Sequence, residues 1–274
     1  MILLQGVDMH VHTTASDGIF DAAYLIDLAI GQGICGIAIS DHDTVAAVAP
    51  AMAYAKAQAE NKDFLVVPAI EISAEWQERE IHILGYGIDF ESPYLLQELQ
   101  KLQKEREIRL VKILAKLKEH GIVLDAEKLN AMGEGVIGRA HIARLMVQEK
   151  YCQSMGEVFE NWLSRKGKAY VTRPKLSPAE AINLVRKAGG VPVMAHPGMA
   201  KADAYISTMV ELGLGGLEIH HPNHTLEDTV HYEKLADAYG IFKTGGSDCH
   251  GDRVGMITTP LETVKAILNA PKHV

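Results

Sequence analysis

Short runs of aliphatic and β-branched residues alternate with helical segments along most of the chain, and this alternation limits the fold more than any other feature. Periodicity and residue type predict seven strands, at residues 2–9, 34–40, 64–70, 81–86, 191–195, 216–220 and 242–246. They predict helices at 20–31, 45–61, 178–188, 202–212, 226–239 and 261–269. Strands that alternate with helices form parallel βα units. The sequence therefore predicts an α/β barrel, complete or distorted.

The segment 92–172 breaks this alternation, because it contains consecutive helical patterns and no strand. Its first helix is predicted to run from 93 to 120 and to stop at Gly121. Further helices are predicted at 138–149 and 154–165. An apolar stripe lies along the first helix, formed by Leu95, Leu99, Leu102, Leu110, Ile113 and Leu117. We predict a helical cap, 92–172, inserted into a barrel made of 1–91 and 173–274.

The charge and composition exclude several classes of protein. The chain carries 27 basic and 35 acidic residues, a net charge of −8, which argues against capture of long nucleic acid by phosphate neutralisation. Residues 101–118 hold seven basic residues against two acidic ones, which we interpret as a solvated outer face of the cap. There is no apolar run of the roughly 20 residues that a membrane helix needs. With no signal-peptide pattern and only three cysteines, the sequence predicts a cytoplasmic protein.

Histidines and carboxylates cluster where the predicted strands end. In a barrel of parallel strands, functional side chains gather at these carboxyl ends. His10 and His12 are two residues apart in the first strand, so their side chains point to the same side. Asp17 follows in the next loop, and His42 and Asp43 follow the second strand. Asp43 has the alternative role of a helix cap, a role that does not explain His42.

The remaining strands carry similar groups. Glu71 lies within an apolar run, where a lone carboxylate has a large desolvation cost without a partner. His82 lies among aliphatic residues and, taken alone, fits a core histidine. His196 ends a later strand, and the last strand leads into Asp248 and His250. A set of nitrogen and oxygen ligands from histidines and carboxylates, without paired thiolates, is typical of Mn, Fe, Zn or Co sites.

These motifs, in this order, resemble the polymerase and histidinol phosphatase (PHP) family of metal-dependent phosphoesterases. The matching segments are His10-x-His12, Ser40-Asp41-His42-Asp43, Glu71-Ile72-Ser73, Ala195-His196-Pro197 and Ser247-Asp248-Cys249-His250. The resemblance covers nearly the whole chain and implies a distorted seven-stranded (βα) barrel with an inserted helical cap. It also implies two to three divalent ions, with Mn expected and Zn or Fe as alternatives.

The resemblance implies one set of ligands for each ion. The first ion would be bound by His10, His12, Glu71 and Asp248. The second would share Glu71 and add His82 and His196. The third would be bound by Asp17, His42 and His250. All nine positions carry competent ligands.

Within the family, the chain resembles a subgroup with a helical insertion whose members act on nucleotides. This implies hydrolysis of a phosphate monoester, with the 3′-phosphate of nucleoside 3′,5′-bisphosphates as the expected reaction. Trimming of short RNA from its 5′ end is the alternative. Arg139 and Lys168 of the cap are the expected phosphate ligands. Asp43, His221 or His224 is expected to assist proton transfer, with orientation of His42 as the other role for Asp43.

Two other classes of protein remain open at this stage. A barrel amidohydrolase also begins with His-x-His, but its bridging ligand is commonly a lysine, where this chain has Glu71. A metal-stabilised, non-catalytic binding module is the second alternative. The complete set of ligands and the separate cap favour the phosphoesterase over both.

Overall fold

The strands form one eight-stranded sheet in the order β7-β6-β5-β4-β3-β2-β1-β8. The computed structural model describes residues 4–58, 63–133 and 135–271. The strands are β1 (Leu4–Val11), β2 (Ile34–Ile39), β3 (Leu65–Trp76), β4 (Arg79–Tyr86), β5 (Val191–Met194), β6 (Gly216–His220), β7 (Phe242–Gly245) and β8 (Thr259–Pro260). The seven predicted strands are therefore present, and β8 is an additional one. The predicted start of the first strand, at residue 2, lies outside the described residues.

The sheet curves into a nearly closed α/β barrel, as the sequence predicts. The segment after β7 reaches β1 at the far edge, where Val11 and Cys249 form a parallel bridge. The backbone N–H of His12 donates to the carbonyl of Cys249 at 2.9 Å, and the N–H of Cys249 donates to the carbonyl of His10 at 3.2 Å. These bonds bring the last motif of the sequence, around Asp248, against the first, around His10.

Strand β4 runs antiparallel to both of its neighbours, which differs from the parallel units that the alternation predicts. The reason lies in the turn between β3 and β4. Gln77 and Glu78 connect Trp76 to Arg79, and both have positive φ, 46° and 65°. Two left-handed residues form a tight hairpin turn, and a hairpin joins antiparallel strands only. As a result, the beginning of β4 lies at the end of the barrel where the other strands, β3 and β5 among them, finish.

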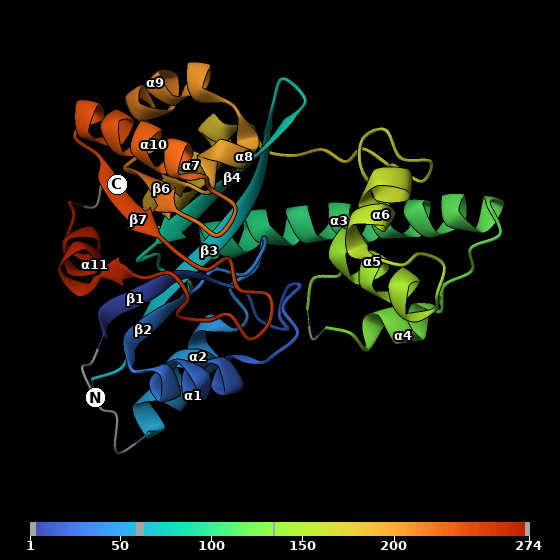
Figure 1. Cartoon of the computed structure of the whole chain (residues 1–274), viewed down its shortest axis with the longest axis horizontal. Coiled ribbons are helices and arrows are strands. Elements are labelled where there is room, and N and C mark those ends of the chain that lie inside the picture. The colour runs from blue at the N-terminus through green and yellow to red at the C-terminus, as the bar shows by residue number, and fades with distance from the viewer. Residues whose placement is uncertain (1–3, 59–62, 134, 272–274) are drawn as a thin grey trace.

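Helices surround the sheet and return the chain between parallel strands (Figure 1). They are α1 (Ala22–Gln32), α2 (Val48–Ala57), α7 (Pro178–Lys187), α8 (Pro197–Ala200), α9 (Asp203–Glu211), α10 (Leu226–Tyr239) and α11 (Leu261–Leu268). Several begin with the expected caps: the Ser177 hydroxyl, for example, accepts from the N–H of Glu180. The short α8 was not predicted, and residues 59–61 of the second predicted helix lie outside the described residues.

The segment between β4 and β5 forms a separate helical block. The long helix α3 (Pro93–Glu119) runs from the barrel outward, and α4 (Ala126–Asn130), α5 (Arg139–Gln148) and α6 (Met155–Val158) pack near its far half (Figure 1). Pro93 occupies the first turn of α3, where its missing N–H costs nothing. The predicted helix 154–165 is divided into α6 and a π-helix, η1 (Phe159–Leu163).

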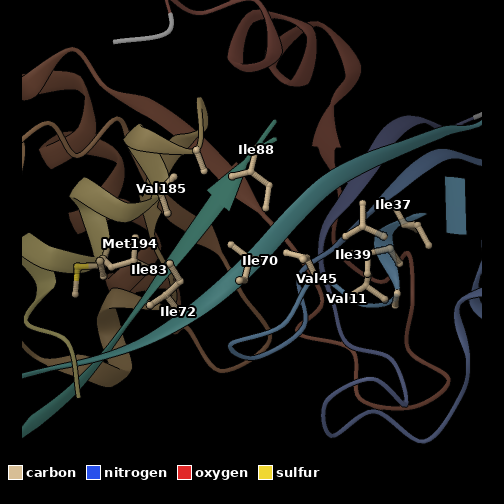
Figure 2. Close-up of a cluster of buried hydrophobic side chains, with 14 of the residues drawn as sticks. Val11, Ile37, Ile39, Val45, Ile70, Ile72, Ile83, Ile88, Val185 and Met194 are labelled. Atoms are coloured by element: carbon tan, nitrogen blue, oxygen red, sulfur yellow. The ribbon is translucent and has the colours of Figure 1, made fainter. Parts of the chain in front are cut away.

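The barrel and the helical block have separate hydrophobic cores. Figure 2 shows part of the barrel core, where Ile70 and Ile72 of β3 pack near Ile83 of β4. The proximal part of α3 covers this core through Leu95 and Leu99. The distal part contributes to the second core, which is formed by Ile113, Leu117, Ile122, Leu129, Ile142, Ala143, Leu145, Met146, Cys152, Val158, Leu163 and Ala169. Thus α3 links two bodies of buried apolar residues.

None of the described helices combines the length and the apolarity that crossing a membrane requires.

Closure of the barrel depends on a close approach at Gly246. A Cβ atom at this position would lie 2.3 Å from Cβ and 2.5 Å from the backbone N of His10. We expect Gly246→Ala to lower the free energy of unfolding by about 1–3 kcal/mol, since neither backbone can move freely. Gly31→Ala in α1 is the control, because a Cβ there meets nothing within 4 Å. Denaturant melts should show Gly31→Ala to be more stable than the parent protein by about 0.5–1 kcal/mol; equal effects would contradict the close approach.

Candidate metal centre

The nine predicted ligands converge at one end of the barrel. They come from β1 and its loop (His10, His12, Asp17), the end of β2 (His42), β3 (Glu71), β4 (His82), the end of β5 (His196) and the segment after β7 (Asp248, His250). His82 belongs to this group because β4 is antiparallel, which places its first residues beside the finishing ends of the other strands. The isolated reading of His82 as a core histidine does not fit this position.

Glu71 lies at the centre of the cluster and is almost fully buried. Its Oε2 is 2.9 to 3.4 Å from ring nitrogens of His10, His12 and His42. Its Oε1 is 2.8 Å from Nδ1 of His82 and 3.1 Å from Nε2 of His196. Burial acts to raise the pKa of this carboxyl, but the adjacent histidines outweigh it and hold the pKa well below its usual range. Glu71 is therefore an ionised carboxylate surrounded by imidazoles.

Two aspartates complete the cluster on either side. Oδ1 of Asp248 is 3.4 Å from Nε2 of His10 and 3.2 Å from Nε2 of His12. Oδ1 of Asp17 is 3.2 Å from Nε2 of His250, and its Oδ2 is 3.9 Å from Nε2 of His42. For both aspartates burial opposes ionisation, and the facing histidines lower the pKa well below its usual range.

Several of these polar atoms are buried without a hydrogen-bond partner among the described residues. They include Nε2 of His10 and His12, Nδ1 of His42, Oε2 of Glu71, Nε2 of His82 and Nδ1 of His196. Oε2 of Glu71 and Nδ1 of His42 are only 2.9 Å apart, yet neither satisfies the other with hydrogen-bond geometry. Native proteins rarely leave buried polar atoms unsatisfied. Lone pairs that converge in this way fit a group of divalent cations.

Three sets of ligand atoms lie within 4.8 Å of one another in the described part of the chain. They are His12, Asp17, His42 and His250; His10, His12 and Asp248; and His42, Glu71 and His82. These sets overlap with the three predicted ligand sets but are not identical to them. His42 joins Glu71 and His82 in the third set, where His196 was expected. His196 instead contacts Glu71 through Nε2 at 3.1 Å, and its ring lies against the rings of His10 and His82.

Three residues in or beside the cluster have the left-handed backbone conformation. Asp43, His196 and Asp248 have φ of 53°, 31° and 47°. Such conformations cost of order 1–3 kcal/mol each for a residue with a Cβ and are concentrated at functional sites. The backbone turns sharply at these strand ends, which directs the ligands toward one point.

Comparison with known proteins identifies the cluster. No family model matches the sequence. The chain is 30% identical over 250 residues to the 5′-3′ exoribonuclease Rnm of Escherichia coli, covering 89% of this chain and 84% of the relative. It is 31% identical to a phosphoribosyl 1,2-cyclic phosphate 1,2-diphosphodiesterase of Eggerthella lenta, covering 89% and 94%. It is 29% identical to a 3′,5′-nucleoside bisphosphate phosphatase of Chromobacterium violaceum, covering 92% and 90%.

Two solved structures share the whole architecture. A metal-dependent phosphoesterase from Bifidobacterium adolescentis is 29% identical, with a TM-score of 0.88 over 97% of this chain and 96% of that one. A Chromobacterium violaceum protein described as an amidohydrolase, with bound sulfate and no metal, is 28% identical, with a TM-score of 0.85 over 94% and 93%. The chain belongs to the PHP family. It is a metal-dependent phosphoesterase, a hydrolase acting on phosphoric ester bonds, and the family prediction from its motifs is confirmed.

Buried carboxylates that the sequence analysis did not assign hold this PHP centre in place. Glu218 of β6 accepts from Nδ1 of His10 at 2.9 Å and from the backbone N–H of His196 at 2.8 Å. Asp41 accepts from the hydroxyl groups of Thr13 and Ser16 at 2.8 and 2.6 Å. Glu218 had the same signal as Glu71, an acidic residue inside an apolar strand, and could have been found from the sequence.

Asp43 and His224, the predicted catalytic residues, are held by groups outside the cluster. The Asp43 carboxylate accepts from Nε of Arg106 at 2.7 Å, from Nη2 of Arg173 at 3.1 Å and from the N–H of Ser73 at 2.9 Å. Nδ1 of His224 donates to the carbonyl of Ile219 at 2.8 Å. Its Nε2 accepts from the N–H of Gly198 at 3.2 Å. Both side chains thus fix the loops that carry His42 and His196.

A pocket of about 170 Å³ opens between the PHP centre and the helical block. Asp17, His42 and His82 reach it from the barrel, and Arg106, Arg109, Arg139 and Arg173 line its other side. The structure thus brings Arg139 to the site, where its Nη2 contacts both oxygens of Glu80 at 2.9 and 3.0 Å.

The other expected phosphate ligand does not reach this pocket. Lys168 is exposed and is not among the described residues that line the pocket, and its Nζ lies 5.1 Å from the centre of the Trp162 ring. Arg106 and Arg109, in contrast, were predicted to face solvent as part of the basic stretch. They point inward because they lie on the buried face of α3, where Arg106 is four residues after Leu102 and Arg109 is four residues before Ile113.

We expect Glu218→Gln to weaken metal binding by roughly ten- to a hundred-fold, since the charge that fixes the ring of His10 is lost. Glutamine preserves the volume, so the fold should remain. Titration of the protein against a chelator of known affinity measures this change. Glu211→Gln, on the exposed end of α9, serves as the matched control. Unchanged metal affinity in Glu218→Gln would show that this carboxylate does not support the centre.

Proposed function

We propose that this protein removes the 3′-phosphate of nucleoside 3′,5′-bisphosphates, giving a nucleoside 5′-monophosphate and phosphate. The observation that carries the proposal is the position of the arginine-lined pocket directly beside the cluster of histidines and carboxylates. A substrate with two phosphates needs two anion sites a few ångströms apart. The Chromobacterium violaceum relative named for this reaction supports the assignment.

We assign the nine ligands to three divalent ions, with Mn as the expected metal. His10, His12, Glu71 and Asp248 would hold the first. Glu71, His82 and His196 would hold the second. Asp17, His42 and His250 would hold the third. When bound, such ions lower the pKa of water toward neutrality and neutralise charge on phosphate oxygens.

The chain's own residues have separate tasks in this proposal. Glu218 accepts the Nδ1 proton of His10, which leaves Nε2 of that ring as the ligand atom. The Asp43 carboxylate, paired with Arg106 and Arg173, acts as a positioning group for His42 rather than as a proton carrier. His224 positions the turn that carries His196. His221, with Nε2 3.2 Å from Asp248, is the remaining candidate for proton transfer.

Arg139 and Lys168 support different candidate substrates: Arg139 supports the bisphosphate, and Lys168 supports short RNA. Arg139 lines the pocket and would contribute to the site of the non-reacting phosphate. Lys168 lies outside it, next to the ring of Trp162 on the cap. A cation beside an aromatic ring suits the backbone and bases of a single strand. This surface and the Escherichia coli relative support trimming of short RNA from the 5′ end as the second candidate.

We also propose the cytoplasm as the location and small nucleotides or short oligonucleotides, rather than long nucleic acid, as the ligands.

The metal assignment predicts more than one transition-metal ion per chain. Activity should disappear on chelation and return with Mn²⁺. Glu71→Gln should lose more bound metal than His250→Gln, because Glu71 would contact two ions and His250 one. Elemental analysis of the purified proteins measures both. A single ion in the fully active protein would overturn the multinuclear assignment.

The substrate assignment predicts a ranked set of rates with metal-loaded protein. Adenosine 3′,5′-bisphosphate should exceed AMP, histidinol phosphate, phosphoribosyl 1,2-cyclic phosphate and a 5′-phosphorylated short RNA in kcat/KM by about tenfold or more, a difference of 1.4 kcal/mol. Phosphate release and chromatography of the AMP product give the measurement.

The second candidate makes the opposite prediction. If the RNA is the best substrate, Lys168→Ala should slow its cleavage and leave hydrolysis of the bisphosphate unchanged. Faster cleavage of the RNA than of the bisphosphate would replace the first assignment by the second.

A further inference from the structure

The loop after β1, which carries Asp17, lies against the helical block. The backbone N–H of Val136 donates to the carbonyl of Ala15 at 3.0 Å. A Cβ atom at Gly135 would lie 2.2 Å from the same carbonyl oxygen, so this approach leaves no room for a side chain. The inserted block and the barrel are therefore in direct backbone contact two residues before Asp17.

Arg144 of α5 contacts the ligand residue itself. The side chain is half-buried, and its Nη2 donates to the backbone carbonyl of Asp17 at 2.9 Å. Because the bond is to the backbone, the Asp17 carboxylate remains directed at the ring nitrogens of His42 and His250. Arg144 thus holds the position of Asp17 without occupying its ligand atoms.

His141 lies one turn before Arg144 on α5 and is fully buried. Its Nδ1 accepts from the backbone N–H of Gly138 at 3.0 Å. Burial lowers the pKa of His141 to about 4, so the ring is neutral at pH 7 and carries its proton on Nε2. Nε2 lies close to the carbonyl of Ser16 but has no partner with hydrogen-bond geometry among the described residues. An unpaired buried donor costs free energy, which favours close approach of the loop to α5.

The barrel holds the other side of the same loop. The Asp41 carboxylate accepts from the N–H of Thr13 at 2.7 Å and from the hydroxyl of Ser16 at 2.6 Å. These bonds fix the residues that precede Asp17. Among the described residues, the hydrogen bond to the Asp17 carbonyl comes from Arg144. The position of Asp17 therefore depends on both the barrel and α5.

We propose that Arg144 is a positioning residue through which the helical block completes the site of the third ion. Ligand atoms of His12, Asp17, His42 and His250 lie within 4.8 Å of one another, and Asp17 is the member of this set that α5 holds. The inference rests on the proposed function only for the assignment of an ion to this set. By linkage, an ion bound at Asp17 also strengthens the attachment of the helical block.

The charge of Arg144 and its hydrogen bond have opposite effects on a bound cation. A guanidinium beside the site repels a metal ion, so removal of the charge alone should tighten metal binding. Removal of a group that orients a ligand instead weakens metal binding, by roughly ten- to a hundred-fold for residues that contact the ligands. The direction of the change therefore shows which role Arg144 has.

The chain offers a matched control for the arginine. Arg186 of α7 is also half-buried, and its Nη1 donates to the backbone carbonyl of Leu212 at 3.3 Å. Arg144→Met removes the proposed positioning bond, and Arg186→Met removes a bond of the same kind elsewhere in the barrel. Arg144→Lys keeps the charge and a donor, and should restore metal binding in part.

Gly135→Ala tests the same contact from the backbone. Its Cβ would displace the carbonyl of Ala15, and the shift should weaken the same ion. Gly156→Ala, in α6 of the same block, is the control, because the nearest atom to a Cβ there is Oγ of Ser154 at 3.9 Å. Equal effects of the two substitutions would contradict a role for this contact.

Calorimetric titration of the metal-free full chain with Mn²⁺ measures the affinity for each ion, and Asp17→Asn identifies the ion that needs this loop. We expect Arg144→Met to weaken that ion by roughly tenfold and to leave the others unchanged. Arg186→Met should match the parent protein. In assays of phosphate release, Arg144→Met should need more Mn²⁺ for half-maximal activity and recover its kcat at saturating Mn²⁺, which a distorted fold would not do.

The outcomes separate this inference from the metal assignment. If Asp17→Asn binds as many ions as the parent protein, the assignment of a third ion is wrong and the inference fails with it. If Asp17→Asn loses an ion while Arg144→Met binds that ion equally or more tightly, the assignment stands and the inference alone is overturned. Equal weakening of all ions in Arg144→Met would show a general structural role and would also overturn it.

Discussion

The ionised carboxylate of Glu71, buried beneath five imidazole rings, is the interaction on which the rest of the centre depends. A buried charge is tolerated only when it is paired, and the strand ends supply the pairing groups from all sides of the barrel. The pairing is incomplete in the protein alone, since Oε2 of Glu71 and several ring nitrogens have no hydrogen-bond partner among the described residues. Metal binding and the stability of this end of the barrel are therefore linked.

The same region connects the barrel to the helical block through Asp43. Its backbone N–H donates to the carbonyl of Glu71 at 3.0 Å, and its carboxylate binds Arg106 of α3 and Arg173 of the segment before α7. A residue adjacent to His42 thus contacts α3 of the insertion and Arg173, which directly follows the insertion. Because this contact is buried, displacement of α3 removes one of the two cations that pair with Asp43 beside the metal centre, and we expect the two parts to move together.

The relatives suggest how one centre serves several reactions. Three proteins of 29 to 31% identity carry the names of an exoribonuclease, a cyclic phosphate diphosphodiesterase and a bisphosphate phosphatase. All three names describe hydrolysis of a phosphate ester, but the molecule that carries the phosphate differs. In this chain, a wall of arginines from α3, α5 and the segment before α7 lines the pocket beside the centre. We propose that substrate choice depends on this wall.

The sequence alone determined the barrel class, the helical insertion and the group of candidate ligands. These follow from local rules: the alternation of strands and helices sets the architecture, and strand ends of a barrel meet, so His10, His42, Glu71 and His196 could be grouped before any coordinates. Glu218 was recognisable by the same reasoning as Glu71, because each is an acidic residue within an apolar strand.

Only the tertiary structure decided the direction of β4 and which face of α3, with its arginines, points into the site. The first depends on two left-handed residues, Gln77 and Glu78, which have no glycine or asparagine to mark the turn. The second depends on packing. Arg106 and Arg109 belong to a basic stretch that resembles a solvated surface, and tertiary contacts bury them: Arg106 lies against Asp43, and Arg109 lies against Tyr170 and Val171. Long-range contacts between segments as distant as Asp43 and Arg173 have no local signature, which is why charge pattern alone assigned these residues to solvent.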